Sequence, residues 1–353
     1  MALLAPILDV DHLASATVAI QATIGVARVA LLPPASTALR SVSVTLDSDG
    51  LGDFSLDFEA GDTIGQALQV IDQSQLAVGA EVSIALGADG TSATLTIGEI
   101  TSVGFEMSQG GASISVSGFD LRHRLRQGMY LRTFVDKDDL QIAEAICKER
   151  GLSVKVEKAL GDTPPMHYIV RQGEASDFEF VHDRLDRIGY ELAVDADSLV
   201  IRPPTPQPLN PFLMPSFTPK TVRSFNATHS AVEEIDGVVI IGRDKDKNLK
   251  IVGTAGTTSS LVPPQPRVLT LHRAVADVDS AKKMAAQELS RRKEQAMTAS
   301  ISVRGDATLV PGVWVQLSEV GPFSAAWRVR TATHRWSPGG GYTTDLSLRQ
   351  EGD

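Results

Sequence analysis

The chain has 353 residues and a mass of 37.6 kDa, a length that corresponds to two or three domains. Hydrophobic residues make up 42% and charged residues 22%, which are ordinary globular values and exclude a chain that is disordered throughout. The single cysteine, Cys147, excludes an internal disulfide framework and a metal cluster held by several cysteines.

Negative charge is concentrated in the N-terminal third of the chain. The net charge is −10, and residues 1–120 hold fourteen Asp and Glu but only two basic residues, Arg28 and Arg40. Such acidity repels phosphate backbones, so we expect no nucleic-acid recognition through this part. Two explanations stay open: the charge serves solubility, or it forms an acidic inner wall or an acidic face for a partner.

The N-terminus is apolar but is not typical of a secretory signal. No basic residue precedes the apolar stretch, and Asp9 and Asp11 follow it at once. No apolar run approaches the ~20 residues that are needed to span a bilayer. We therefore expect a soluble chain that is made in the cytoplasm and does not insert into a membrane.

Residues 16–120 alternate between apolar and polar side chains, with Gly and Asp turns at roughly ten-residue spacing. This pattern predicts at least six strands in an antiparallel barrel or sandwich, and we assign residues 1–125 to a first, acidic β-barrel domain. Within it, residues 61–76 carry Ile64, Leu68 and Ile71 at helical spacing, which predicts a short helix beside the sheet.

Residues 126–202 predict a small α+β module. Asp138 or Asp139 can cap a helix that ends before Gly151, and Ser176 with Glu179 forms the capping box of a second helix that ends at Gly189. Short strands are expected at residues 153–159, 166–172, 190–195 and 198–203.

A proline-rich connector follows at residues 203–219, where seven of seventeen residues are proline. Proline removes ladder donors and fixes φ, so this segment is expected to be extended along a surface. Residues 220–353 then predict a second β-barrel domain with one long helix at 278–296 and a long hairpin at 236–255. The tip of that hairpin, Arg243–Asn248, is polar and should project.

Two segments echo each other, residues 99–120 and residues 328–349. Each has an alternating strand that ends on a bulky residue, Met107 or Trp336, followed by serine, a glycine pair and a second alternating strand. A generic hairpin and a diverged, duplicated barrel explain the echo equally well.

A search for catalytic chemistry is negative. The chain has no Walker loop, dinucleotide-binding glycine motif, zinc-protease motif or nucleophile elbow, and its seven histidines lack ligand spacing. We therefore expect no enzyme, no cofactor and no catalytic or metal site. Asp47, Asp49 and Asp53 resemble a calcium loop, but they lack its twelfth-position glutamate and favour a hairpin turn. Cys147 falls on the apolar side of a helix and should be inert.

The order of these parts resembles the late control protein D family of contractile-tailed phages. The family is similar to phage baseplate hubs, to the N-terminal part of VgrG spikes and to hubs of phage-like contractile injection systems. The resemblance is carried by the stretches GFDLRHRL, RQGEASDFEFVHDRLDRIGYELAVDADSLVIRPP, LVPGVWVQL and WRVRTATHRWSPGGGYTTDLSLR, at residues 118–125, 171–204, 309–317 and 327–349.

The resemblance implies a mainly β fold with two tail-tube-like barrels around the α+β module. It implies a non-enzymatic, trimeric adapter that joins the hexameric inner tube protein to a trimeric spike protein, the latter expected as a separate chain, among other baseplate proteins. Such a hub would assemble in the bacterial cytoplasm and become part of a virion tail or injection particle. The acidic first domain would then line part of a lumen or face a neighbouring ring, and neutralising Asp47, Asp49, Asp53, Asp57 and Glu59 together should change cargo passage or assembly.

Partner contacts are expected where the chain can reach outward, at the hairpin tip and in the connector. These candidates are Asp244, Lys245, Asp246, Lys247, Asn248, Pro211 and Phe212. Two other functions stay open. The first is a carbohydrate-binding or adhesin β-protein that uses Trp314, Trp327 and Trp336. The second is a hydrolase with a dispersed pair of carboxylates in a cleft.

Overall fold

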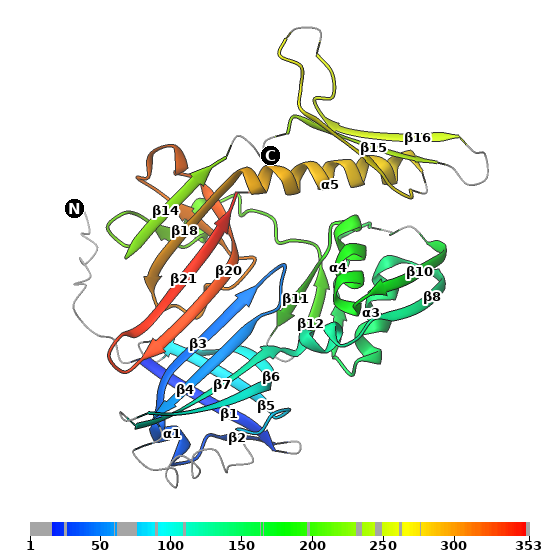
Figure 1. Ribbon diagram of the computed structural model, residues 1–353. Coiled ribbons are helices and arrows are strands. Elements are labelled where there is room, and N and C mark those ends of the chain that lie inside the picture. The colour runs from blue at the N-terminus through cyan, green and yellow to red at the C-terminus, as the bar shows by residue number, and fades with distance from the viewer. Residues whose placement is uncertain are drawn as a thin grey trace.

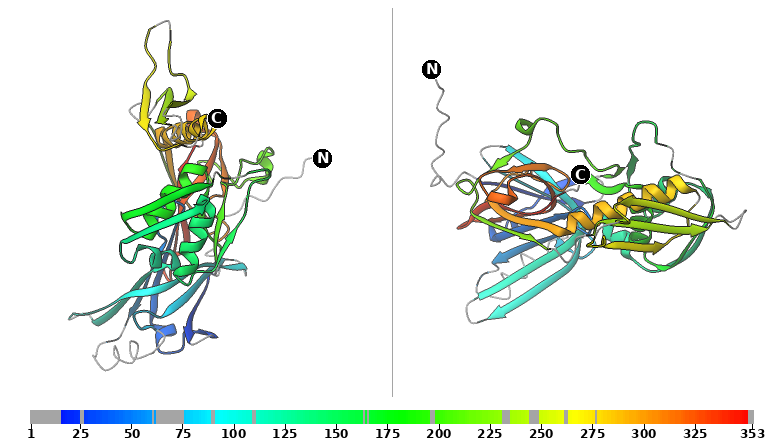
Figure 2. Two further views of the ribbon diagram at one scale, coloured as in Figure 1. Left: turned by 90° about the vertical axis from the view of Figure 1, so that its right-hand side faces the viewer. Right: turned by 90° about the horizontal axis from the view of Figure 1, so that it is seen from above.

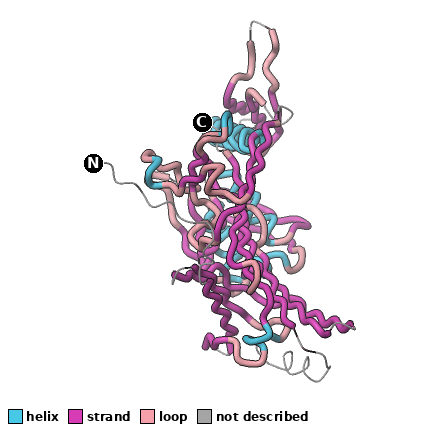
Figure 3. Tube along the Cα trace, turned by 90° about the vertical axis from the view of Figure 1, so that its left-hand side faces the viewer, coloured by secondary structure: helices cyan, strands magenta, loops and turns pink. Residues whose placement is uncertain are grey.

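Two β-rich regions joined edge to edge form the long axis of the chain, with the α+β module beside them (Figure 1). Views from other sides show an elongated molecule built mainly of strands (Figures 2 and 3). The computed structural model describes residues 16–24, 27–59, 61, 76–88, 91–108, 111–162, 164, 166–195, 198–230, 235–243, 249–260, 263–275 and 277–350. The fold is therefore mainly β, as the sequence predicts.

The first β region forms because its strands alternate strictly. On β3 and β4 the apolar residues Val42, Val44, Phe54 and Leu56 are buried in one core, while the residues between them face outward. The helix expected at residues 61–76 falls almost wholly outside the described residues. The elements are β1 (Ala16–Ile24), β2 (Ala27–Ala30), α1 (Ala35–Ala38), β3 (Leu39–Asp47), β4 (Asp53–Glu59), β5 (Glu81–Ala88), β6 (Thr91–Ser108) and β7 (Gly111–Asp120).

Both expected helices of the α+β module are confirmed. Asp138 caps α3 (Asp139–Glu149), Ser176 and Glu179 form the capping box of α4 (Asp177–Ile188), and Gly189 ends α4 at φ +74°. A strand that the sequence analysis missed, β8 (Tyr130–Lys137), pairs with β10. The other elements are η2 (Leu121–Arg126), β9 (Val154–Val156), β10 (His167–Ala175), β11 (Glu191–Asp195) and β12 (Ser198–Arg202).

The connector leads into the second β region, which carries a separate small sheet. In that small sheet β15, β16 and β17 pack on the long helix α5 through a core that includes Val238, Ile240 and Ala281. The hairpin and the helix expected there are both confirmed. The elements are η3 (Pro211–Leu213), β13 (Ser216–Phe217), β14 (Ser224–His229), β15 (Gly237–Arg243), β16 (Lys250–Gly256), β17 (Val268–His272), α5 (Val278–Ala296), β18 (Met297–Arg304), β19 (Trp314–Leu317), η4 (Gly321–Phe323), β20 (Ala326–Ser337) and β21 (Gly341–Arg349).

One continuous sheet runs through both β regions. Its order is β14, β18, β21, β20, β3, β4, β7, β6, β5, β1, β2, and the antiparallel pairing of β20 with β3 joins the two regions. The sequence led us to expect two separate barrels. Strand pairing in the described part of the chain follows an open path, so closure of either region into a barrel stays a prediction.

The same five-strand order occurs twice in this sheet. In the first region β3, β4, β7, β6 and β5 are neighbours in that order, and in the second region β14, β18, β21, β20 and β19 are. Every pair within both sets is antiparallel. The two echoing segments of the sequence are the corresponding hairpins, β6 with β7 and β20 with β21. The repeated order favours a duplicated unit over a generic hairpin.

Candidate partner-binding surfaces

The outward face of the continuous sheet is polar and partly acidic. Cross-strand register places Thr45 beside Asp53, and Asp57 beside both Ser41 and Ser115. Asp53, Asp57 and Glu59 are exposed on β4. Partial burial of the Asp53 carboxylate, together with the nearby negative charges of Asp120 and Asp47, raises the pKa of Asp53. Hydroxyl side chains continue this face across the join between the regions, through Thr331 and Thr333 of β20.

The turn between β3 and β4 is a hairpin turn, as the sequence favoured. The Asp47 carboxylate accepts hydrogen bonds from the backbone N–H groups of Asp49, at 2.8 Å, and Gly50, at 2.9 Å. Burial alone would raise the pKa of Asp49, but Arg349 and Arg330 hold it below its usual value. Among the described residues no three His, Cys, Asp or Glu side chains come together as a metal site.

The connector presents apolar side chains to solvent. Leu209, Phe212 and Leu213 are exposed, and Phe212 is 96% exposed in the short helical turn η3. The connector is nevertheless fixed at both sides of that turn. The indole N–H of Trp314 donates to the carbonyl of Thr205 at 2.9 Å, and β13 pairs in parallel with β19. Pro211 and Phe212 are thus held out from the second β region on an anchored loop.

The other expected contact site is the tip of the hairpin between β15 and β16. Register runs from Gly237 opposite Gly256 to Arg243 opposite Lys250, which confirms the hairpin. Asp244, Lys245, Asp246, Lys247 and Asn248 lie outside the described residues.

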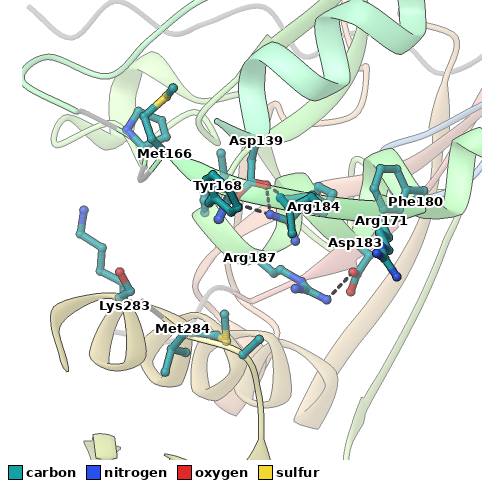
Figure 4. Close-up of a pocket in the computed structure, with 18 of the residues that line it drawn as sticks. Asp139, Met166, Tyr168, Arg171, Phe180, Asp183, Arg184, Arg187, Lys283 and Met284 are labelled. Atoms are coloured by element: carbon teal, nitrogen blue, oxygen red, sulfur yellow. Dashed lines mark hydrogen bonds and ion pairs between the residues drawn. The ribbon is translucent and has the colours of Figure 1, made fainter. Parts of the chain in front are cut away.

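A cleft of about 850 Å³ lies between α4, β10 and α5 (Figure 4). Two of its acidic residues, Asp139 and Asp183, are engaged with basic side chains, and a third, Glu179, belongs to the capping box of α4. Asp139 contacts Arg184 and lies 3.0 Å from His167, and Asp183 accepts from Arg187 at 2.7 Å. A glycosidase needs two carboxylates that act on a substrate, whereas these carboxylates hold the walls of the cleft together. The arrangement therefore does not favour the hydrolase alternative.

The three tryptophans do not form an exposed platform. Trp314 and Trp327 are buried in the second β region, and the indole N–H of Trp327 donates to the carbonyl of Phe323 at 3.0 Å. Trp336 packs against the core of the first region. Sugar-binding aromatic residues need an open ring face, so this arrangement does not favour the carbohydrate-binding alternative.

Buried ion pairs, which no motif in the sequence revealed, hold the α+β module in place. Asp177 is fully buried and accepts from Arg132 at 2.9 Å, from Arg150 at 2.7 Å and from Gln172 at 2.8 Å. Glu191 of β11 accepts from Arg328 of β20 at 2.6 Å and so ties the module to the second β region. These contacts fix how the outward surfaces sit relative to one another.

The join between the module and the first β region is also ionic. Asp120, at the end of β7, accepts from Arg122 at 2.8 Å, and Arg122 in turn donates to the backbone carbonyls of Asp47 and Leu192. Asp120 and Arg122 both lie in the GFDLRHRL stretch, residues 118–125. The sequence pattern located this transition, but it did not show that the stretch contacts both β3 and β11.

Comparison with family models gives a match over residues 21–335 to the model described as the Alg8 N-terminal domain. The chain belongs to this family. No curated protein matches. The fold is shared with the 43 kDa tail protein of prophage MuSo2 from Shewanella oneidensis, at a TM-score of 0.69 and 17% identity over 95% of this chain and 98% of that one.

Two further solved structures share the fold. The tail protein from Neisseria meningitidis has a TM-score of 0.69 and 15% identity, covering 94% of this chain and 96% of that one. The Escherichia coli c3393 protein, a component of the type VI secretion system with structural similarity to bacteriophage T4 tail proteins, has a TM-score of 0.60 and 12% identity over 89% of this chain and 74% of that one. The fold of this family member is therefore that of tail proteins. The closer resemblance to late control protein D stays a prediction.

Among the described residues no helix is long and apolar enough to cross a membrane.

Proposed function

We propose that the chain is a structural, non-enzymatic baseplate hub of a contractile phage tail or a phage-like injection system. As a homotrimer it joins the hexameric inner tube to the trimeric spike, which is a separate chain. It assembles in the bacterial cytoplasm and becomes part of the particle. In this proposal residues 1–125 and 220–353 each complete a barrel, with the module at 126–202 and the connector at 203–219 between them.

The duplicated five-strand order is the observation that carries this proposal. A trimer of a chain with two similar units presents six of them, which is the number that a sixfold tube requires on one side. The threefold symmetry of that trimer matches the trimeric spike on the other side. The shared fold with tail proteins supports the same assignment. The anchored, apolar connector around Pro211 and Phe212 and the hairpin tip at residues 244–248 are the proposed contact sites for tube, spike or other baseplate proteins.

The first experiment is the mass of the purified protein by light scattering, alone and after mixing with the candidate spike protein. We expect a trimer in one of the two states, or a stable three-to-three complex. A chain that stays monomeric with the spike and with the tube protein would refute the hub assignment.

We further propose that the acidic face of β4 lines the lumen of the trimer, where like charge limits adhesion of the molecules that pass through. Asp47 and Asp49 hold the hairpin turn, and Glu59 pairs with Arg40, so Asp53 and Asp57 are the residues to neutralise. Asp53→Asn with Asp57→Asn should leave the trimer intact and change cargo passage or tube attachment. A double variant with unchanged passage and assembly would refute a lumenal role.

A further inference from the structure

The two halves of β6 have different neighbours. Residues 91–99 pair with β5 on one edge, and residues 98–108 pair with β7 on the other edge. Beyond Ile100, whose N–H donates to the carbonyl of Ala80, the β5-side edge of β6 pairs with no strand among the described residues. The long β6–β7 hairpin reaches out from the first β region (Figure 2). In the described part of the chain, the strand edge of seven residues Thr101–Met107 therefore has no partner strand.

The corresponding edge in the second unit is covered. Residues 326–328 of β20 pair with β19, which corresponds to β5, and residues 331–336 of β20 then pair with β3 of the first unit. Alignment of the two hairpins places Met107 at the position of Trp336, and Phe105 at the position of His334. The open edge of β6 thus corresponds to the part of β20 that joins the two units.

Side-chain exposure agrees with this correspondence. On β20, His334 is fully buried and Trp336 packs against the core of the first region, because Val44 and Val42 of β3 lie opposite them. The equivalent positions on β6 are apolar but uncovered, with Phe105 at 46% and Met107 at 45% exposure. Large apolar side chains at inward-facing positions of an open strand edge indicate an interface with a further strand.

The matching strand is β14. In the repeated order β14 takes the place of β3, and β14 ends the sheet with β18 as its one strand partner in the described chain. Phe225 and Ala227 of β14 correspond to Val42 and Val44 of β3, because both pairs face equivalent positions on β18 and β4. The described part of each copy therefore carries one open edge like that of β6 and one like that of β14. The open edge of β6 on one copy therefore fits the open edge of β14 on another copy.

We propose that residues 103–107 of β6 in one copy pair antiparallel with β14 of the next copy. The register of β20 with β3 transfers directly, so Met107 lies opposite Phe225 of the next copy, and Phe105 opposite Ala227 of the next copy. The contact between copies repeats the contact between the two units inside one copy. Repeated head to tail, such contacts close a ring. That the ring holds three copies rests on the proposed function; the pairing itself does not.

The register is tested by cysteine pairs. Glu106→Cys with Asn226→Cys places the two thiols directly opposite across the proposed pairing, and Glu106→Cys with Thr228→Cys shifts them by two residues. Within one copy β14 and β6 are seven strand spacings apart in the sheet, about 34 Å if the sheet were flat, too far for an internal bond. Cys147 is buried and stays in both variants.

After mild oxidation we expect the matched pair to give covalent dimers and a closed covalent ring on non-reducing gels, and the shifted pair to give at least fivefold less. Equal or absent cross-linking in the matched variant would overturn the proposed register.

A disruptive variant separates this proposal from the hub assignment. Phe105→Lys with Met107→Glu should abolish self-association in light scattering while the melting temperature of the monomer is unchanged, because both side chains are exposed in one copy. The matched control is Leu131→Lys, an exposed apolar residue on β8. Trimers that survive the double variant would overturn the edge pairing and leave the hub assignment standing. Wild-type chains that never form a trimer with spike or tube would remove the hub assignment itself.

Discussion

His334 makes the join between the two β units sensitive to pH. It lies on β20 opposite Val44 of β3, is fully buried, and has its Nδ1 2.8 Å from the Tyr342 hydroxyl and 3.2 Å from the Thr344 hydroxyl. Burial lowers the pKa of His334 to about 4, against the smaller raising effects of the Leu309 backbone and of Asp306. The imidazole is therefore neutral at pH 7.

The sign of the effect follows from the two pKa values. In the unfolded chain the pKa of histidine is about 6.5, so the unfolded state takes up this proton first as the pH falls. The folded state loses no stability from this group above pH 6.5 and loses it progressively between pH 6.5 and pH 4. At 1.36 kcal/mol per pKa unit the loss is about 2.5 kcal/mol by pH 4.5.

The assay is urea unfolding followed by tryptophan fluorescence, which reports both β regions, because Trp314 and Trp327 are buried in the second region and Trp336 packs against the core of the first. The wild type should lose about 2.5 kcal/mol more than His334→Gln between pH 7.5 and pH 4.5. His272→Gln, at an exposed histidine, is the matched control and should follow the wild type. Parallel pH curves for wild type and His334→Gln would refute the reasoning.

Three further predictions concern the buried contacts. Asp177→Ala should lower the free energy of unfolding by about 3 kcal/mol in urea titrations, because Arg132 and Arg150 lose the carboxylate that they share. An unchanged free energy of unfolding would contradict a stabilising role for these buried ion pairs. Burial raises the pKa of Cys147 to about 12, so at pH 8 it should react with a disulfide reagent only when the chain unfolds, and fast reaction in buffer would contradict this. Trp314→Phe removes the hydrogen bond to Thr205 and should speed proteolysis of the connector severalfold; an unchanged cleavage rate would show that β13 alone anchors it.

Local signals were predicted well from the sequence. The caps at Asp138, Ser176 and Gly189 depend on residues within one turn of the helix end, so both module helices were found with nearly correct bounds. The strand β8 was missed because its apolar residues Leu131 and Val135 are exposed, which leaves no clear division into a buried and a polar face.

Long-range contacts were beyond the reach of the pattern. The pairing of β20 with β3 brings together Thr331 and Asp47, and nothing in either segment indicates its partner. The candidate partner-binding surfaces also divide into a part that local sequence predicts and a part that depends on long-range contacts. Phe212 was expected to be accessible and is, but the open edge at Phe105 and Met107 became visible only when β6 could be compared with β20.

The pairing of β20 with β3 also affects how the chain is made. β3 is synthesised early, and the strand that covers its edge follows 284 residues later, because Asp47 pairs with Thr331. At 5–20 residues per second the ribosome needs about 15–60 s to reach that strand. During this interval the edge of β3 is open to other strands, including residues 103–107 of β6 in a neighbouring nascent chain, which correspond to the part of β20 that pairs with β3. The topology of the sheet therefore leaves this edge exposed to incorrect pairing until the C-terminal strands have been made.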